Sequence, residues 1–122
     1  MGLYLTLLPL SGPERLTETV VTCYDRLSFD QDYDIFNQLT DSRGGKPTIK
    51  AHPLPPHKCI EIHGCDGIKL ISDDGYGAEL TFVYAQQIKG LIVGDNASSK
   101  NKAIKAFIDA LRDDTPIILL WH

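Results

Sequence analysis

A short stretch near the middle of the chain combines histidine, cysteine and glutamate side chains that could bind a metal ion or carry out cysteine chemistry. If this stretch is a β-strand, alternate side chains project from one face. The side chains with that parity are His57, Cys59, Glu61, His63 and Cys65. A tetrahedral zinc site needs four ligands to converge, whereas this row would extend over about 25 Å. The interpretation that we favour is therefore the polar outer face of a strand with a buried or half-buried cysteine.

A second interpretation assigns the same face to a small metal-dependent or cysteine-dependent enzyme. Its site would use His57, Cys59, His63 and Cys65, with zinc as the cofactor, because thiolates and imidazoles are the ligands that Zn²⁺ prefers. The chain contains no C-x-x-C pair, and no third group that would orient a Cys/His pair can be identified. On the favoured interpretation the protein needs no cofactor.

Four aspartates in the first third of the chain, Asp25, Asp30, Asp32 and Asp34, could form an acidic surface. The last three alternate as in a calcium-binding loop, where carboxylates surround a hard cation. Ile35, however, stands where that loop requires glycine. An acidic start to a short helix, favoured by the helix dipole, accounts for the same spacing. We therefore expect these aspartates on a surface that binds another protein.

A glycine-rich segment, Asp73-Asp74-Gly75-Tyr76-Gly77, is predicted to form the tip of a hairpin. Loops on rigid scaffolds often carry recognition residues, so Asp73, Asp74 and Tyr76 are candidate contacts for a partner. The preference of aspartate and glycine for turns also explains the segment. Both interpretations place it on the surface.

The segment Gly94–Asn101 lies between an apolar run and a helical pattern, which is the context of a phosphate-binding loop. It departs from the G-x-x-x-x-G-K-[ST] pattern, because Ser99 replaces the second glycine and Asn101 replaces the hydroxyl residue that binds Mg²⁺. We therefore expect a serine-capped helix and no nucleotide site. The first amides of this helix, from Ser98 to Lys100, together with Lys100 and Lys102, could at most hold an adventitious anion.

Composition and charge narrow the classes of function further. The chain has 122 residues, 43% of them apolar, and a formal net charge of −4. These values indicate one globular domain, residues 1–122, and argue against direct binding to nucleic acid. No apolar run is long enough to span a bilayer, so we expect no membrane contact. An odd number of cysteines, three, does not form the framework of a small secreted protein, so we expect a cytoplasmic location.

The chain also lacks the motifs of serine hydrolases, zinc proteases and dinucleotide-binding enzymes. We therefore predict a non-enzymatic interaction protein. It would act as an accessory factor or inhibitor that binds another protein through its acidic surface or its hairpin loop.

The first half of an α+β fold would position these candidates as follows. Residues 3–10 are almost continuously apolar and end at a Pro/Gly cluster, which predicts a core strand. Residues 14–29 allow a helix that follows a capping-box pattern, or a strand because of their β-branched residues. We favour a strand over about residues 19–29, paired with the first one. A short helix is predicted from residue 30 to 39, followed by an extended, proline-rich surface connection over residues 46–58.

The second half carries the stronger signals. Three runs separated by Asp-Gly turns predict a mainly antiparallel sheet with a three-stranded β-meander over about residues 58–85. A long C-terminal helix is predicted over about residues 98–112, and a final core strand over residues 115–121. The segment 79–121 is long enough for a right-handed crossover from strand through helix to strand. The buried stripe of the helix would comprise Ala103, Ile104, Phe107, Ile108 and Leu111.

The final strand bears on the oligomeric state. Ile117, Leu119 and Trp121 would face one side of the sheet, and Ile118 and Leu120 the other. At a sheet edge such a strand would pair with, or pack on, a second copy in a homodimer. In the centre of the sheet it would need no partner. Both arrangements are compatible with the sequence.

Two segments, Tyr24–Tyr33 and Asp114–His122, resemble stretches of small uncharacterised bacterial or prophage-encoded proteins. The resemblance implies an accessory role, such as that of a phage or prophage inhibitor of a host or defence protein. A small acidic protein can occupy a basic channel by presenting carboxylates to it.

Overall fold

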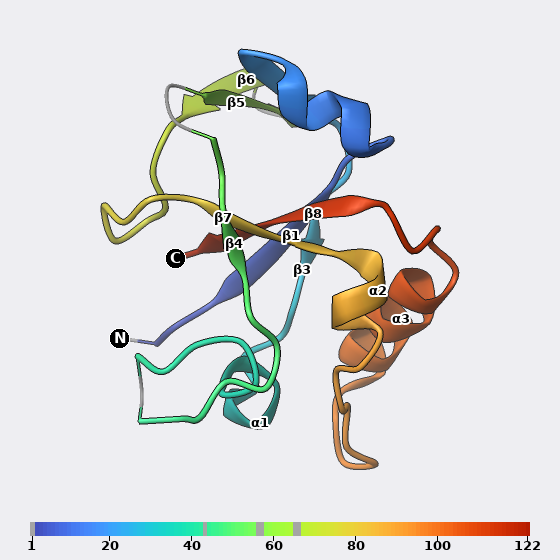
Figure 1. The fold of residues 1–122 in the computed structure, drawn as a ribbon. Helices are drawn as coiled ribbons and strands as arrows, with labels where there is room; N and C mark the ends of the chain where they lie inside the picture. Colours follow the sequence, from blue (N-terminus) through green and yellow to red (C-terminus); the bar gives the residue numbers. More distant parts are fainter. Residues whose placement is uncertain (1, 43, 56–57, 65–66) are drawn as a thin grey trace.

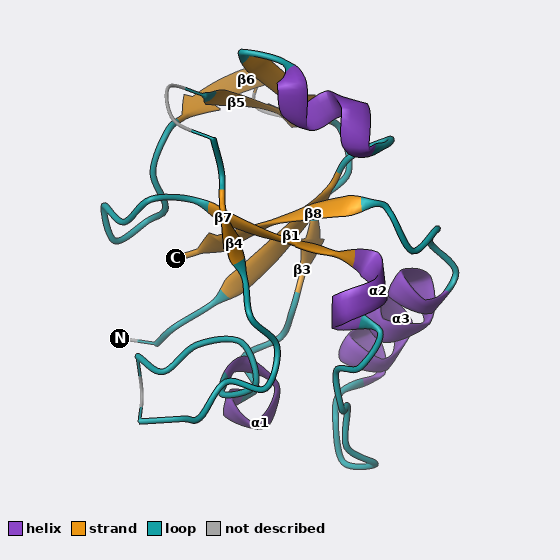
Figure 2. Cartoon of the chain, viewed as in Figure 1, coloured by secondary structure: helices purple, strands orange, loops and turns teal. Residues whose placement is uncertain are grey.

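The chain folds into two β-sheets and a set of short helices, which confirms the α+β class (Figures 1 and 2). The computed structural model describes residues 2–42, 44–55, 58–64 and 67–122. In chain order the elements are β1 (Leu5–Pro9), the 3-10 helix η1 (Pro13–Thr17), β2 (Val20–Cys23), β3 (Leu27–Ser28), α1 (Tyr33–Phe36), β4 (His52–Pro53), β5 (Cys59–Gly64), β6 (Gly67–Ile71), β7 (Thr81–Tyr84), α2 (Ala85–Ile88), α3 (Ser99–Asp109) and β8 (Pro116–Trp121).

The larger sheet has the strand order β3-β1-β8-β7-β4, and every neighbouring pair in it is antiparallel. β8 lies at its centre. Ile117 and Leu119 pack on one side of this sheet and Ile118 packs on the other. A strand that is apolar on both faces needs cover on both sides, which an interior position supplies. The prediction of a core strand is confirmed. β8 is paired with β1 and β7, so it has no free edge at which a second copy of the chain could pair with it.

The smaller sheet contains β2, β5 and β6, with β2 parallel and β6 antiparallel to β5. The β5–β6 hairpin agrees with the predicted meander, but the third strand of that meander is wrong. β7 joins the larger sheet, and an isolated bridge between Asp73 and Glu79 is left at the turn. Phe82 and Val83 explain the difference, because these consecutive residues point to opposite faces and are both buried. The smaller sheet has an exposed face and could not bury both.

The ambiguous segment 14–29 forms neither one helix nor one strand. It starts in η1, continues as β2 in the smaller sheet, and ends as β3, in which Ser28 is paired with Thr6 of β1. The predicted pairing with the first strand is therefore confirmed for β3 and wrong for β2, and no hairpin joins β1 to β3, because η1 and β2 lie between them in the chain. Val21 and Cys23 account for the position of β2, since both are buried in the core between the two sheets.

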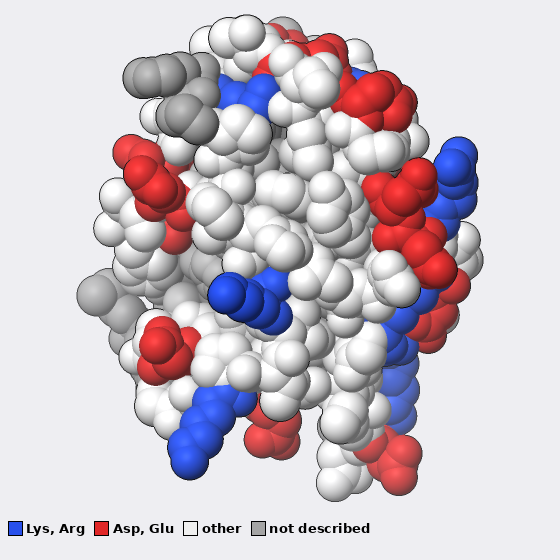
Figure 3. All heavy atoms as spheres, in the orientation of Figure 1, with Lys and Arg blue, Asp and Glu red and all other residues white. Residues whose placement is uncertain are grey.

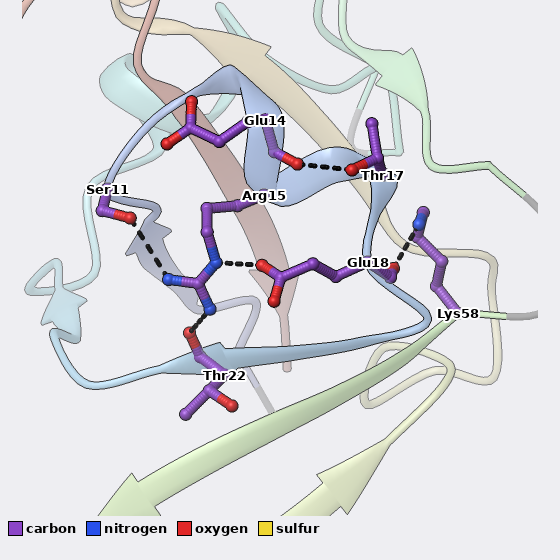
Figure 4. Close-up of polar contacts among 7 residues, drawn as sticks. All are labelled: Ser11, Glu14, Arg15, Thr17, Glu18, Thr22 and Lys58. Carbon is purple, nitrogen blue, oxygen red and sulfur yellow. Dashed lines mark hydrogen bonds and ion pairs between the residues drawn. The ribbon is translucent and has the colours of Figure 1, made fainter.

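A close-up shows how η1 closes the β2 edge of the smaller sheet (Figure 4). The Arg15 guanidinium donates to the main-chain oxygen of Thr22 in β2 (3.1 Å), to Ser11 Oγ (3.2 Å) and to the Glu18 carboxylate. Lys58, which precedes β5, donates to the main-chain oxygen of Glu18. Within the described part of the chain, β6 has a strand on one side only and forms the open edge of this sheet.

The helices α1 and α3 begin at the predicted capping residues. Asp32 Oδ1 accepts hydrogen bonds from the amides of Asp34 (3.0 Å) and Ile35 (3.3 Å). Ser98 Oγ accepts one from the amide of Asn101 (3.1 Å). Both are side-chain caps of the usual kind, which satisfy amides that have no partner inside the helix.

α3 ends at Asp109, earlier than predicted, and its buried stripe is narrower. Ile104 and Ile108 are buried, whereas Ala103 and Phe107 are exposed, so the prediction was wrong for these two positions. The helix lies at the margin of the core and presents one line of side chains to it. The predicted right-handed crossover is also wrong, because it would join parallel strands and β7 and β8 are antiparallel neighbours.

The proline-rich connection over residues 46–58 contributes one strand that the sequence does not reveal. β4 pairs with β7 at the edge of the larger sheet, with His52 opposite Phe82. Proline is compatible with this position, because an edge strand needs ladder hydrogen bonds on one side only. Pro53 can therefore lie within β4.

The larger sheet is the middle layer of three (Figure 1). The helices α1, α2 and α3 cover one of its faces, where Leu5 and Leu7 of β1 pack among Ile35, Ile88 and Ile104. The smaller sheet covers the other face. The core between the two sheets is formed by Leu8, Leu10, Val21, Cys23, Ile60, Ile62, Leu80, Phe82 and Ile118.

Candidate functional site

β5 has the alternation that the sequence predicts. Ile60 and Ile62 are buried in the core between the sheets. Glu61 and His63 lie on the opposite face, where the Glu61 carboxylate is hydrogen-bonded to His63 Nε2. Cys59 is a half-buried free thiol on this strand. The favoured interpretation, a polar strand face with a half-buried cysteine, agrees with this arrangement.

Of the four candidate zinc ligands, the structure describes two, Cys59 and His63. His57 and Cys65 lie outside the described residues. Among the residues that are described, no three histidine, cysteine, aspartate or glutamate side chains gather closely enough to hold a metal ion. The geometry of the described pair therefore provides no metal centre by itself.

Apolar side chains flank the Glu61–His63 pair on the exposed side of the smaller sheet. Glu61 is paired with Leu70 of β6, and His63 with Ile68, so these four side chains share one face. Leu70 is 61% exposed and Ile68 is 63% exposed. The Tyr24 ring, 70% exposed, packs on His63 at 4.9 Å between ring centroids. We call this surface the outer sheet face; it consists of Val20, Thr22, Tyr24, Cys59, Glu61, His63, Ile68 and Leu70.

The four predicted acidic residues do not all have the same part in the structure. Asp25 lies in the connection between β2 and β3, whereas Asp30, Asp32 and Asp34 lie around the start of α1. The Asp32 carboxylate is used as the helix cap. The main chain of Asp30 is held by Asn101, whose Oδ1 accepts from the Asp30 amide (2.8 Å). On the face shown in Figure 3, acidic side chains form several separate groups around the margin.

The predicted hairpin loop is held by its own side chains. Asp74 Oδ1 accepts hydrogen bonds from the amides of Tyr76 (2.8 Å) and Ala78 (3.0 Å), so turn formation explains this carboxylate. The Tyr76 hydroxyl, which has one proton to donate, lies within hydrogen-bond distance of the main-chain oxygens of His122 (3.0 Å) and Gly2 (3.3 Å). The loop is thereby fixed against the end of β8 and separates two hollows.

The first hollow lies on the helix side of the larger sheet and is mainly apolar. Its volume is about 620 Å³, and Leu3, Leu39, Ala51, Thr81 and Trp121 are among the residues that line it. This size suits a small molecule, but apart from the loop it offers few groups that would orient one.

The second hollow, the inter-sheet pocket, lies where the two sheets separate and has a volume of about 570 Å³. Thr6 of β1 is at its base. Thr6 Oγ1 is 2.9 Å from Ser28 Oγ and 2.9 Å from His122 Nε2. Burial lowers the pKa of His122 below its usual value of 6.5, and the charge of Lys69 lowers it further. The pocket is lined by Thr6, Arg26, Ser28, Ile62, Lys69, Ile71, Asp73, Asp74, Gly75, Lys100, Leu120 and His122.

Sequence reasoning missed the group formed by Thr6, Ser28 and His122. The hydrogen bonds join residues that are 22 and 116 positions apart, so local pattern carries no sign of them. The one available signal is Thr6, a polar residue within an apolar strand at a position that turns out to be 5% exposed. Together these groups could exchange hydrogen bonds with a small polar ligand.

Among the described residues, Cys23 is the second group whose pKa is shifted by its environment. Burial raises the pKa of its thiol to about 11, although the nearby Arg15 charge acts in the opposite direction. A nucleophilic cysteine needs a low pKa, because the thiolate is the reactive form. Cys23 is therefore a core residue and unsuited to cysteine catalysis.

No protein-family model matches this chain, and the comparisons with curated proteins and with solved structures found no match either. Within the described residues, none of the helices combines the length and the apolar character needed to cross a membrane.

Proposed function

We propose that this chain is a non-enzymatic interaction protein that binds another protein through the outer sheet face. The observation that supports the proposal is the exposure of four apolar side chains on one face of the smaller sheet. Ile68 and Leu70 lie on one side of β5, and Val20 and Tyr24 on the other. Single exposed apolar residues are common on protein surfaces, whereas a contiguous group is typical of an interaction site.

Burial of the exposed β6 side chains by a partner would stabilise the complex. Burying one large aliphatic side chain contributes about 1.5–3 kcal/mol. The Tyr24 ring lies across β5 from Ile68 and Leu70 and packs on His63. Aromatic residues are enriched among those that contribute most to protein interfaces. A partner that covers these three side chains would gain apolar contact area in the middle of the interface.

Charge indicates what kind of partner fits. The outer sheet face contains one carboxylate, Glu61, and no lysine or arginine. The Glu61 carboxylate already contacts His63, and it would also accept a hydrogen bond from a basic side chain. We therefore expect a partner protein with an apolar surface that carries a lysine or arginine opposite Glu61. The proposed interface therefore contains one acidic residue, Glu61, and none of the four aspartates of the predicted acidic surface.

The proposal is tested by purifying tagged variants from the source cells and quantifying the proteins that accompany them. The test variant, Ile68→Lys/Leu70→Lys, places charges on the outer sheet face. The matched control is Ile92→Lys, because Ile92 is 73% exposed and lies in the connection between α2 and α3. A partner that is retained by the control and lost by the test variant supports the proposal. Equal retention by both variants contradicts it.

Two further outcomes would place the interface elsewhere. The variant Asp25→Asn/Asp30→Asn/Asp34→Asn leaves the Asp32 helix cap intact, and loss of the partner in this variant alone would assign binding to the acidic residues. Sedimentation equilibrium detects a second copy of the chain as the occupant. A dimer that the Ile68→Lys/Leu70→Lys variant abolishes would replace the heterologous partner by self-association.

A further inference from the structure

The inter-sheet pocket has features that the proposed protein interface does not use. The face of the larger sheet that is turned toward the smaller sheet is apolar along Leu8, Leu10, Phe82 and Ile118. At one end of this face the side chains are polar. There Ser28 of β3 and Thr6 of β1 lie side by side, and His122 follows β8. A buried hydroxyl in an apolar sheet requires hydrogen-bond partners, and Thr6 finds them in this row.

Positive side chains from three separate elements surround this row. Arg26 precedes β3, Lys69 belongs to β6 and Lys100 to α3, and all three line the pocket. Lys69 is paired with Ile62, whose side chain is in the core, so Lys69 points inward, between the sheets. None of the three cations forms an ion pair with a residue that the structure describes. On a chain with a net charge of −4, this is an unusual concentration of free positive charge.

The pocket also contains two negatively charged side chains. Asp73 and Asp74 belong to the loop beside β8, where the Gly75 amide donates to the main-chain oxygen of Trp121 (2.8 Å). β8 and β3 are separated by β1 in the sheet, so Ser28 lies about 10 Å across the sheet from β8. The Asp74 carboxylate is in addition bound by two loop amides. The loop that carries the two carboxylates is thus separated from Ser28 by two strand spacings.

The hydroxyl row can direct a proton toward such an anion. Each hydroxyl has one proton to donate. When His122 Nε2 donates to Thr6 and Thr6 donates to Ser28, the Ser28 proton is left for a ligand. We propose that the inter-sheet pocket binds a phosphate group at Ser28, between Arg26, Lys69 and Lys100.

The number of cations favours phosphate over a carboxylate. A phosphate monoester carries a charge of about −1.5 to −2 at neutral pH and has three acceptor oxygens. Three cations and the Ser28 hydroxyl match these oxygens, whereas a carboxylate has a single charge and two oxygens. The pocket volume of about 570 Å³ leaves space for the rest of a small phosphorylated molecule, with Asp73 placed to accept from its hydroxyl or amino groups.

Binding is measured by NMR titration of the full chain with four probes: inorganic phosphate, glycerol phosphate, acetate and glycerol. We expect the two phosphates at millimolar concentration to shift the signals of Thr6, Ser28 and His122, and the other two probes to leave them unchanged. Tighter binding of glycerol phosphate identifies a phosphorylated small molecule as the ligand, and equal binding identifies phosphate itself. Equal shifts with acetate, or no shift with phosphate, would overturn the proposal.

Variants then test the pocket residues. Lys69→Met and Lys100→Met remove one charge each from exposed side chains, and we expect each to weaken phosphate binding about tenfold. Ser28→Ala removes the proposed donor with the same direction of effect. The matched control is Lys50→Met, since Lys50 is exposed and lies next to β4, at the opposite edge of the larger sheet. A loss of affinity in the control as large as in the pocket variants would show nonspecific attraction and reject the site.

Discussion

Asn101 joins two distant parts of the chain through its side chain alone. Its Oδ1 accepts from the Asp30 amide (2.8 Å) and its Nδ2 donates to the Asp30 main-chain oxygen (3.1 Å). The residue is 1% exposed, so water cannot replace these bonds. We predict that Asn101→Ala lowers the free energy of unfolding by about 1–3 kcal/mol, because two main-chain groups lose their partner. Urea unfolding measures the change, and the exposed loop variant Asn96→Ala, expected within about 0.5 kcal/mol of the parent, is the control.

His122 reports the charge inside the inter-sheet pocket. We predict that Lys69→Met raises the pKa of His122 toward 6.5 but not to that value, because burial, the larger cause of the lowering, stays in place. An NMR titration of the imidazole measures the shift, and Lys50→Met should leave it unchanged. An unaltered pKa in the Lys69 variant would show that this lysine does not face the imidazole. The other charged groups that line the pocket are Arg26, Asp73, Asp74 and Lys100.

The same pKa sets the sign of a pH effect on stability. The pKa of His122 is lower in the folded chain than its usual value of 6.5, so the unfolded chain takes up the proton first as the pH falls. The contribution of His122 to stability is complete above pH 6.5 and is lost as the pH falls through the lowered pKa. In Lys69→Met, whose imidazole has a smaller shift, this acid-dependent loss should be smaller. Parallel urea titrations on both sides of pH 6.5 make the comparison.

Cys23 should be protected from alkylation. With a pKa of about 11, only about one thiol in a thousand is a thiolate at pH 8, and the side chain is also buried. We predict that iodoacetamide modifies Cys59 in the folded protein and leaves Cys23 unmodified until urea unfolds the chain. Peptide mapping by mass spectrometry distinguishes the two sites. Rapid modification of Cys23 under native conditions would contradict its place in the core.

At the scale of elements, α3 buries fewer side chains than its hydrophobic pattern predicts. Ile108 is fully buried and Phe107 is 43% exposed, although both belong to the predicted stripe. We predict that Ile108→Ala lowers the free energy of unfolding by about 2–5 kcal/mol, whereas Phe107→Ala costs about 1 kcal/mol or less. Thermal and urea unfolding of the two variants give the comparison. Equal losses would mean that the wide stripe of the sequence pattern is the correct one.

Elements with a strong local signal could be predicted from sequence. Asp32 and Ser98 each mark a helix start, and the alternation of Ile60 and Ile62 marks β5. What could not be predicted is the sheet to which a strand belongs. β2 and β7 have ordinary strand sequences. The strands with which they pair are determined by the apolar faces that still have to be buried when the other elements are in place. That condition depends on the whole chain rather than on a window of residues.

At the scale of the molecule, the two candidate sites differ in how they arise. The outer sheet face is one side of the β5–β6 hairpin and of β2 beside it, and the parity of β5 already indicates three of its eight residues. The inter-sheet pocket needs β1, β3, β5, β6, β8 and α3 together. Asp73, Asp74, Gly75 and Lys100 lie in segments with a recognisable turn or loop pattern, whereas Thr6, Ser28 and His122 belong to no such pattern. The acidic surface and the hairpin loop are predicted from composition and turn chemistry. In the structure the Asp32 carboxylate caps a helix and the Asp74 carboxylate holds a turn.

The position of β8 has a consequence for the order of folding during synthesis. β1 and β7 both pair with β8, and Tyr4 exchanges main-chain hydrogen bonds with His122 (2.7 and 2.9 Å). While the ribosome is still adding residues before Pro116, the larger sheet therefore lacks the strand that joins its two halves. The β5–β6 hairpin, with contacts that are close in sequence, can form earlier. Until β8 emerges, the apolar faces of β1 and β7 depend on chaperones or on transient collapse for protection from aggregation.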